Sequence, residues 1–484
     1  MIEYKDLKKI KDYIFEIPKS YRKDMRVPAR VYATEQMLKD IGGDRSLWQL
    51  VNVATLPGIQ KYSLAMPDIH EGYGFPIGGV AAMDFNEGVV SPGGVGYDIN
   101  CGVRLLRSHI SADEIKDYLR DTAHQINRDV PSGVGRSGEL DLTPGQIDAI
   151  LEKGVPEMIK MGFGREEDIE FIEENGCLAG ADASKISDRA KRRGHDQLGT
   201  LGSGNHFLEI QRVDEIYDKN LAEELGLEKD RVVVMIHTGS RGLGHQVCTD
   251  YVKMMVPKID GWGIELADRE LACAPLKTKE AKDYLAAMAA SANFAWSNRQ
   301  MITHHVRGAW KRILEPHGLD VTLDIIYDVA HNMAKVEEHE VDGEKKKLCV
   351  HRKGATRAFG PGRPELNKLY QRIGQPVLIP GTMGTSSYVL IGTNEAEAES
   401  FGTVCHGAGR RMSRGEAKRK ITGPEVRKEL ESRGIHVECA SSRGLAEEAP
   451  LAYKDVDNVV DVVEQAKLAK RVVKLKPMAV IKGG

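Results

Sequence analysis

The sequence contains no run of about 18 consecutive apolar residues, the length that a transmembrane helix needs, so we expect no membrane span. Its first ten residues, MIEYKDLKKI, are charged and lack the apolar centre of a signal peptide. Low-complexity linkers and internal repeats are also absent from the 484 residues. We therefore expect a globular protein in the cytoplasm.

Cysteine is sparse, with seven residues and no CxxC pair. An odd number of widely separated cysteines in a long chain argues against a disulfide framework. The same separation disfavours a structural zinc site of the zinc-finger type, which needs closely paired ligands. The fold must therefore assemble any metal site from distant parts of the sequence.

The chain also lacks a strongly basic balance, because its net charge is −3 and its pI is about 6.6. Aromatic residues make up only 6% and are not interleaved with basic residues. Both observations argue against a non-catalytic RNA-binding protein. Contacts with a polyanion, if the protein makes them, must come from local basic clusters.

Glycine, in contrast, is abundant, and its 50 residues gather between apolar segments. Such clusters mark tight turns and close backbone approach to a bound group. The periodicity predicts helices over 213–225, 279–314, 424–433 and 456–473, and strands over 231–236, 323–330, 377–379 and 387–391. Because these elements do not alternate regularly, we predict an α+β fold of mixed β-sheets and surrounding helices, in one domain over residues 1–484.

Histidines follow several of the apolar runs. His237 follows RVVVMI, His331 follows LDIIYDVA, His406 follows FGTVC, and His206 follows the turn LGSGN. A single histidine of this kind is more often an ordinary core or surface residue than a ligand. Four histidines in the same context indicate side chains that project into a shared cleft.

The Gly-rich segment SPGGVGYDINCGVR places Asp98 three residues before Cys101. The two side chains can face one metal ion, or two neighbouring ions that share the thiolate. A turn with an ordinary buried cysteine would explain the glycines but not the pairing of Asp with Cys. Thiolate and imidazole suit zinc, whereas carboxylate and imidazole admit manganese, so ligand chemistry leaves the metal open.

Other polar residues are expected around this group rather than in it. Asp68 and His70, in MPDIHEG, would lie behind the ligands and orient a ligand or the substrate. His195, in KRRGHDQLG, is expected to contact substrate or to have no role.

Two specific functions have to be weighed at this point. Lys258 lies in KIDG, the K-x-D-G pattern of nucleotidyltransferases that carry a nucleotide on lysine. That pattern fixes only three positions, and it arises by chance in many chains. A metal-dependent RNA phosphatase or cyclic phosphodiesterase would need the metal site but no nucleotide.

Eight segments in order resemble the RtcB family of RNA-splicing ligases along nearly the whole chain. They are MPDIHEGYGFPIGG, GGVGYDINCGVR, LGTLGSGNHFLE, HTGSRGLGH, YDVAHN, PGTMGTSSYVL, CHGAGR and VIKGG. The resemblance implies an RtcB-type fold and a ligase that depends on GTP and manganese. Such enzymes join an RNA 2′,3′-cyclic phosphate or 3′-phosphate to a 5′-hydroxyl, in tRNA splicing and RNA repair.

The same resemblance implies a role for each site residue. Two Mn²⁺ ions would be bound by Asp98, Cys101, His206, His237 and His331, with Cys101 bridging, and His406 would take GMP through a phosphoramidate bond. Glu209 would accept from the guanine edge and select GTP. The full set implied for GMP is Asn205, His206, Phe207, Leu208, Glu209, His331, Asn332, Pro380, Gly381, Thr382, Met383, Ser387, His406, Gly407, Ala408, Gly409, Tyr453 and Lys482.

The family also implies RNA as the partner. We predict that Arg192, Arg193, Arg241 and Arg414 contact RNA phosphates, and such binding should weaken as salt rises. We expect a monomer, which an archease protein would activate as in many relatives.

Overall fold

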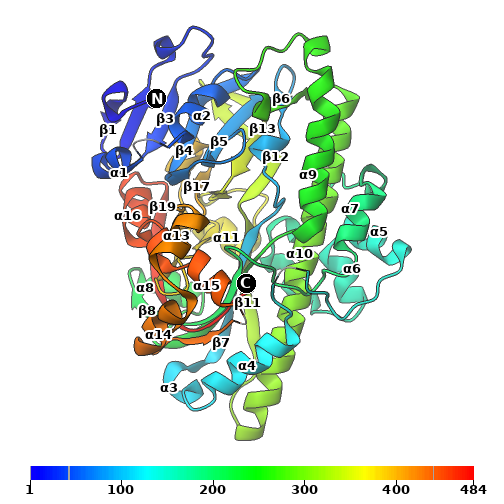
Figure 1. The fold of residues 1–484 in the computed structure, drawn as a ribbon, viewed down its shortest axis with the longest axis vertical. Coiled ribbons are helices and arrows are strands. Elements are labelled where there is room, and N and C mark those ends of the chain that lie inside the picture. Colours follow the sequence, from blue (N-terminus) through cyan, green and yellow to red (C-terminus); the bar gives the residue numbers. More distant parts are fainter. Residues whose placement is uncertain (1, 42–43, 134, 440, 484) are drawn as a thin grey trace.

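The structure is a computed structural model, and it describes residues 2–41, 44–133, 135–439 and 441–483. Two large sheets organise these residues. The first has seven strands in the order β1 (Lys8–Lys11), β2 (Ile14–Ile17), β3 (Ala29–Tyr32), β4 (Ile59–His70), β5 (Ile77–Asp84), β13 (Glu344–Lys353) and β12 (Asn332–Val341). In Figure 1 this sheet lies in the upper half of the molecule, near the N-terminus.

The second sheet carries most of the residues that the sequence singles out. Its order is β11 (Leu323–Ala330), β7 (Gly102–Ser111), β9 (Arg231–Thr238), β8 (Phe207–Ile216), β19 (Ala469–Ile481), β16 (Ser387–Gly392) and β15 (Pro376–Ile379), and β18 (His436–Glu438) pairs with β19. Two short pairs complete the strands: β6 (Val89–Val90) with β10 (Ala274–Pro275), and β14 (Ala355–Arg357) with β17 (Thr403–Cys405).

Two helices, α9 (Arg241–Met255) and α10 (Lys279–Leu314), run side by side along one edge of the molecule (Figure 1). Thr278 caps α10 by accepting from the Ala281 amide, and Pro316 follows its end. Residues 287–303 of α10 are buried on every side. A buried polar group normally needs a hydrogen-bond partner. Asn293, Asn298 and Arg299 in this stretch are bonded to the surrounding structure, whereas Ser297 Oγ has no partner among the described residues.

The remaining helices cover the two sheets and the outer side of α9 and α10. They are α1 (Glu35–Asp40), α2 (Ser46–Val53), α3 (Ala112–Ile115), α4 (Leu119–Asp129), α5 (Pro144–Lys153), α6 (Val155–Lys160), α7 (Asp188–Gly194), α8 (Lys219–Glu224), α11 (Lys368–Ile373), α12 (Asn394–Ser400), α13 (Arg414–Lys420), α14 (Gly423–Ser432), α15 (Ser442–Glu447) and α16 (Val456–Gln465). In the described part of the chain, no helix combines the length and apolar character needed to cross a bilayer.

The α+β class is confirmed, as are the four predicted strands and the helices over 279–314 and 424–433. The helix predicted over 213–225 is wrong for its first part, because residues 213–216 end β8, which pairs with β9 and β19. The helix over 456–473 stops at Gln465, and residues from Ala469 onward enter β19 between β8 and β16. Pairing of residues 213–216 with β19, and of residues 469–473 with β16, overrides local helix propensity in these segments. Organisation as one domain stays a prediction.

Candidate metal centre and adjoining pocket

Strand register brings the histidines and the cysteine together. β11, β7, β9 and β8 are neighbours in the second sheet, and their paired ends lie at one edge. Ala330 pairs with Gly102, Gly102 with Thr238, and Phe207 with His237. These pairs place His331, Cys101, His237 and His206 side by side, although the sequence separates them widely.

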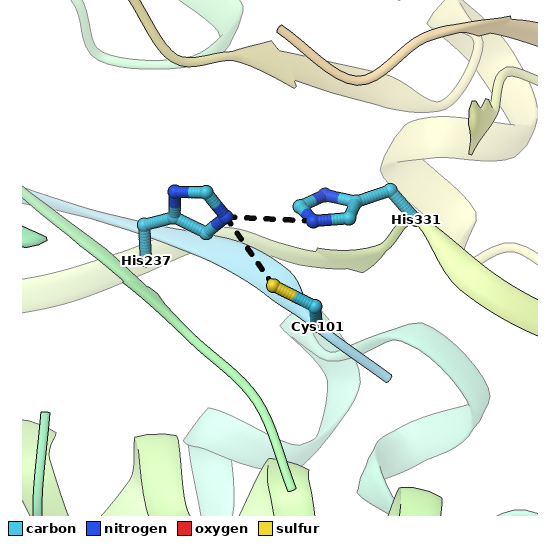
Figure 2. A group of neighbouring side chains, drawn as sticks. All are labelled: Cys101, His237 and His331. Atoms are coloured by element: carbon cyan, nitrogen blue, oxygen red, sulfur yellow. Dashed lines mark hydrogen bonds between the residues drawn. The ribbon is translucent and has the colours of Figure 1, made fainter. Parts of the chain in front are cut away.

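The side chains of this group converge on the Cys101 sulfur. Its Sγ lies 3.4 Å from His206 Nε2 and 3.4 Å from His237 Nε2. His237 Nε2 lies 3.4 Å from His331 Nε2, as Figure 2 shows, and Asp98 Oδ2 lies 2.8 Å from His206 Nε2. The five residues form two groups, Cys101–His237–His331 and Asp98–Cys101–His206, each with its ligand atoms within 4.8 Å of one another. Cys101 belongs to both groups.

The electrostatics of the group suit a cation. Burial lowers the pKa of His237 and His331 well below the usual range, so both imidazoles are neutral and offer a lone pair. Burial raises the pKa of Asp98, but His206 and Arg241 outweigh it and bring this pKa to about 2. Burial and the Asp98 charge raise the pKa of the Cys101 thiol well above 9.0, so a thiolate here needs a bound cation.

The donor set therefore fits a metal ion. One thiol, one carboxylate and three imidazoles present their donor atoms to a common space, and the Nδ1 atoms of His237 and His331 are buried without a partner. The two groups could hold two ions that share Cys101.

Gly239 allows a direct test of whether Asp98 is a ligand of the ion. A Cβ at Gly239 would lie 2.4 Å from Asp98 Oδ1, and both carboxylate oxygens would have to move. We expect Gly239→Ala to weaken Mn²⁺ binding by about 10-fold or more, in the range that disturbed ligand support produces. Isothermal titration of metal-free protein with Mn²⁺ measures the change.

Gly308→Ala is the matched control for this substitution. Gly308 lies in α10 with open space where a Cβ would stand, and alanine favours a helix by up to about 1 kcal/mol. Its Mn²⁺ affinity should equal that of the unmodified chain. Equal affinity in Gly239→Ala would mean that Asp98 does not bind the ion.

A cavity of about 340 Å³ adjoins the metal centre, and His237 and His406 both line it. The His406 ring lies 5.0 Å from the His331 ring, measured between centroids. His406 follows β17 and stands 2.6 Å, through Nδ1, from Asp68 Oδ2. The same carboxylate oxygen accepts the amide N–H groups of His406 and Gly407.

The environment of Asp68 keeps it charged. Burial raises the pKa of this fully buried carboxyl, but His406 outweighs burial and holds the pKa below its usual range. Gly409 has a φ of +66°. A Cβ at this position would lie 2.3 Å from the Asp68 carbonyl oxygen and would collide with it. The glycines of the CHGAG segment thus let the strand that holds Asp68 approach the imidazole closely.

Most residues predicted for the nucleotide line this cavity. They are Asn205, Phe207, Pro380, Gly381, Thr382, Met383, His406, Gly407, Ala408, Gly409, Tyr453 and Lys482. The others stand apart from the cavity wall: His206, Leu208, Glu209, His331, Asn332 and Ser387.

Those six residues have other contacts. His206 and His331 belong to the metal groups, and Asn332 Nδ2 donates to the Asp98 carbonyl at 3.0 Å. Glu209 is fully buried behind the wall, where burial raises its pKa to about 8. Ser387 Oγ accepts from the Gly381 amide and so holds the 380–383 loop.

Two acidic residues that the sequence analysis did not single out, Glu71 and Glu448, line the cavity. Glu448 is only 2% exposed, and it accepts from Arg410 Nη1 at 3.0 Å and from Arg414 Nε at 2.8 Å. It also bonds the Tyr453 hydroxyl. No sequence signal separated Glu448 from the neighbouring exposed acids, because its burial comes from segments that are remote along the chain.

The predicted RNA contacts lie in three places. Arg192 and Arg193 are on α7, and Arg193 Nη1 donates to Gln246. Arg241 begins α9 with a left-handed φ of 54°, and its Nη1 lies 3.5 Å from His206 Nδ1. Arg414 lines the cavity. His195 lies at the end of α7 and is exposed.

The competing lysine lies outside this site. Lys258 is half-exposed after α9, and its Nζ pairs with Glu280 Oε1 at 2.5 Å. The pocket that Lys258 lines shares no residue with the cavity beside His406.

Comparison with known proteins shows which family this chain resembles. A family model described as tRNA-splicing ligase RtcB matches residues 49–483. The chain is 54% identical over 477 residues to a tRNA-splicing ligase RtcB from Archaeoglobus fulgidus, with 99% of each chain covered. It is 53% identical over 483 residues to one from Thermococcus kodakarensis, with 100% of each covered, and equally similar to one from Pyrobaculum aerophilum, with 99% of each covered.

Proposed function

The chain belongs to the RtcB family of tRNA-splicing ligases, and from this premise we propose that it joins RNA ends with GTP as co-substrate, Mn²⁺ at the Cys101 centre and His406 as nucleophile. Membership at this identity makes the protein an enzyme and an RNA ligase of tRNA splicing. The proposal adds the RNA ends, the nucleotide, the ion and the residues. The ends are a 2′,3′-cyclic phosphate or 3′-phosphate and a 5′-hydroxyl.

The observation that carries the proposal is the placement of His406. Its Nδ1 lies 2.6 Å from the Asp68 carboxylate, while its ring borders both the cavity and His331 of the metal centre. When Nδ1, the nitrogen beside the Asp68 carboxylate, carries the proton, the Nε2 lone pair is free to attack. A nucleophile held in one tautomer between a nucleotide-sized cavity and a cation site suits attack on a phosphate.

The proposed reaction forms a GMP adduct on His406 and then consumes it. His406 Nε2 attacks the α-phosphorus of GTP, a phosphoramidate bond forms, and pyrophosphate leaves. An RNA 3′-phosphate, opened from the cyclic phosphate by hydrolysis, attacks the same phosphorus and releases the imidazole. The RNA 5′-hydroxyl then attacks the 3′-phosphate and displaces GMP, which leaves a phosphodiester.

Asp68 stabilises the positive charge that develops on the ring in the first step. The ions held by Asp98, Cys101, His206, His237 and His331 would act as Lewis acids toward the phosphate oxygens. Carboxylate and imidazole ligands are compatible with Mn²⁺, which is the ion that the family resemblance implies.

The residues that line the cavity would hold the GMP moiety. The backbone amides of the glycine-rich segment after His406 can donate to phosphate oxygens. Glu209, Ser387 and Leu208 would act from behind the wall, with Glu209 selecting guanine. We also propose that Arg192, Arg193, Arg241 and Arg414 contact RNA, that archease is an activator, and that the chain works as a single-domain monomer.

The test is a joining assay with two RNAs, one ending in a 2′,3′-cyclic phosphate and one beginning with a 5′-hydroxyl. We expect a joined product with Mn²⁺ and GTP, and at least about 100-fold less joining with ATP, because a site built to bond one base rejects another strongly. Gel electrophoresis of end-labelled RNA measures it. Trimming of the cyclic phosphate without joining, with or without GTP, would instead identify a phosphatase or phosphodiesterase.

A further inference from the structure

The buried stretch of α10 contains an arginine whose five N–H groups are all bonded. Arg299 is 0% exposed. Its Nε and Nη2 donate to the two oxygens of Asp328, each at 2.9 Å. Its Nη1 donates to the carbonyls of Asn100 at 2.9 Å and Thr238 at 2.8 Å, and Nη2 also donates to Asn100 Oδ1 at 2.9 Å.

Two partners of Arg299 lie next to a candidate metal ligand in the sequence, and the third lies on the strand that leads to one. Asn100 precedes Cys101, and Thr238 follows His237. Asp328 lies on β11, three residues before His331. One planar guanidinium thus ties together the three segments that carry the Cys101–His237–His331 group.

The Asn100 backbone shows why such a tie is needed. Its φ is +51°, a left-handed conformation that residues other than glycine seldom adopt. The conformation turns the chain so that Cys101 meets the histidines, and Arg299 bonds both the carbonyl and the side chain of Asn100. Asn100 Nδ2 adds a bond to the Ala292 carbonyl of α10 at 2.7 Å.

We propose that Arg299 is a positioning residue of the metal centre, which fixes the separation of Cys101 from His237 and thereby sets the affinity for the ion. The inference rests on the proposed metal site. The fork geometry of arginine is essential, because lysine has three donors on one atom and cannot bond two carbonyls and both oxygens of a carboxylate at once.

Arg104 provides a matched control within the same network. It is also 0% exposed and also pairs with Asp328, through Nε at 2.7 Å. Its other bonds go to Gln300 and Thr303 on α10, and none goes to a residue beside a ligand. Arg104→Lys therefore perturbs the same buried charge without touching the Asn100 or Thr238 carbonyls.

The experiment titrates metal-free full-length Arg299→Lys, Arg104→Lys and unmodified protein with Mn²⁺, with free Mn²⁺ followed by electron paramagnetic resonance. A Co²⁺ titration follows the thiolate-to-cobalt charge-transfer band of Cys101. Guanidinium unfolding of the metal-free proteins measures stability separately. We expect both variants to lose similar stability, but only Arg299→Lys to bind Mn²⁺ about 10–100-fold more weakly and with a weaker cobalt band.

Two outcomes would overturn this inference alone: unchanged Mn²⁺ affinity in Arg299→Lys, or an equal loss in Arg104→Lys, which would indicate a general effect of the buried charge. An unmodified protein that binds no Mn²⁺ would overturn the proposed metal site and this inference with it. If Arg299→Lys does not fold, Asn100→Gly gives the second test. Glycine keeps the left-handed turn but removes the Oδ1 bond to Arg299 and the Nδ2 bond to Ala292, while the carbonyl bond to Arg299 remains, so affinity should fall by a smaller factor.

Discussion

His406→Ala should abolish the covalent GMP adduct and lower RNA joining by on the order of 10⁴-fold or more, because loss of a nucleophile removes the covalent route. Alanine leaves Asp68 and the metal ligands in place, so Mn²⁺ binding should persist. The measurement is incubation with α-labelled GTP and Mn²⁺, followed by denaturing electrophoresis. A phosphoramidate should be released by acid, and this identifies the bond.

Lys258→Ala is the control, because it removes the competing nucleophile of the KIDG segment. Lys258 pairs with Glu280 at the surface and has no contact with the His406 cavity. The amount of GMP adduct formed by Lys258→Ala should equal that formed by the unmodified protein. An adduct that survives in His406→Ala and vanishes in Lys258→Ala would show that the lysine carries the nucleotide. That result would contradict the proposed mechanism.

Much of the second sheet could be predicted from local sequence. Runs such as RVVVMI are short, β-branched and apolar, and they form β9 and β11 as expected. Residues 213–216 and 469–473 were wrongly predicted to be helical, because pairing with β19 and with β16, respectively, outweighs their helix propensity. Local propensity is a weak signal where a strand has neighbours on both sides.

The candidate site shows the same limit. The sequence indicated that Asp98, Cys101 and the histidines share a cleft, since three of the histidines follow apolar runs and the other residues lie in glycine-rich turns. The arrangement of that cleft depends on register, which aligns Gly102 with both Ala330 and Thr238.

Other site residues carried no sequence signal. Glu448 and Arg299 were missed, because an acid in a helical segment and an arginine in a long helix look like surface charges until tertiary packing buries them. The family resemblance placed Glu209 in the nucleotide site, and the structure places it behind the cavity wall.

Cys101→Ala should have the second large effect, because Cys101 is the residue common to both ligand groups. We expect the unmodified protein to bind two Mn²⁺ ions, His331→Ala and His206→Ala to bind one each, and Cys101→Ala to bind none at concentrations that saturate the others. Removal of a direct ligand should weaken Mn²⁺ binding by more than the roughly 10–100-fold that follows removal of a residue behind the ligands. RNA joining should fall in every variant that loses one of the two ions.

Metal analysis after dialysis against a fixed Mn²⁺ concentration measures these stoichiometries, and guanidinium unfolding of the metal-free variants checks the fold. The graded result separates a shared thiolate from two independent sites. Two sites that did not share Cys101 would leave one ion in Cys101→Ala, held by His237 with His331 or by Asp98 with His206. Because Cys101 Sγ stands 3.4 Å from both His206 Nε2 and His237 Nε2, the geometry favours the shared arrangement, in which one sulfur governs both ions.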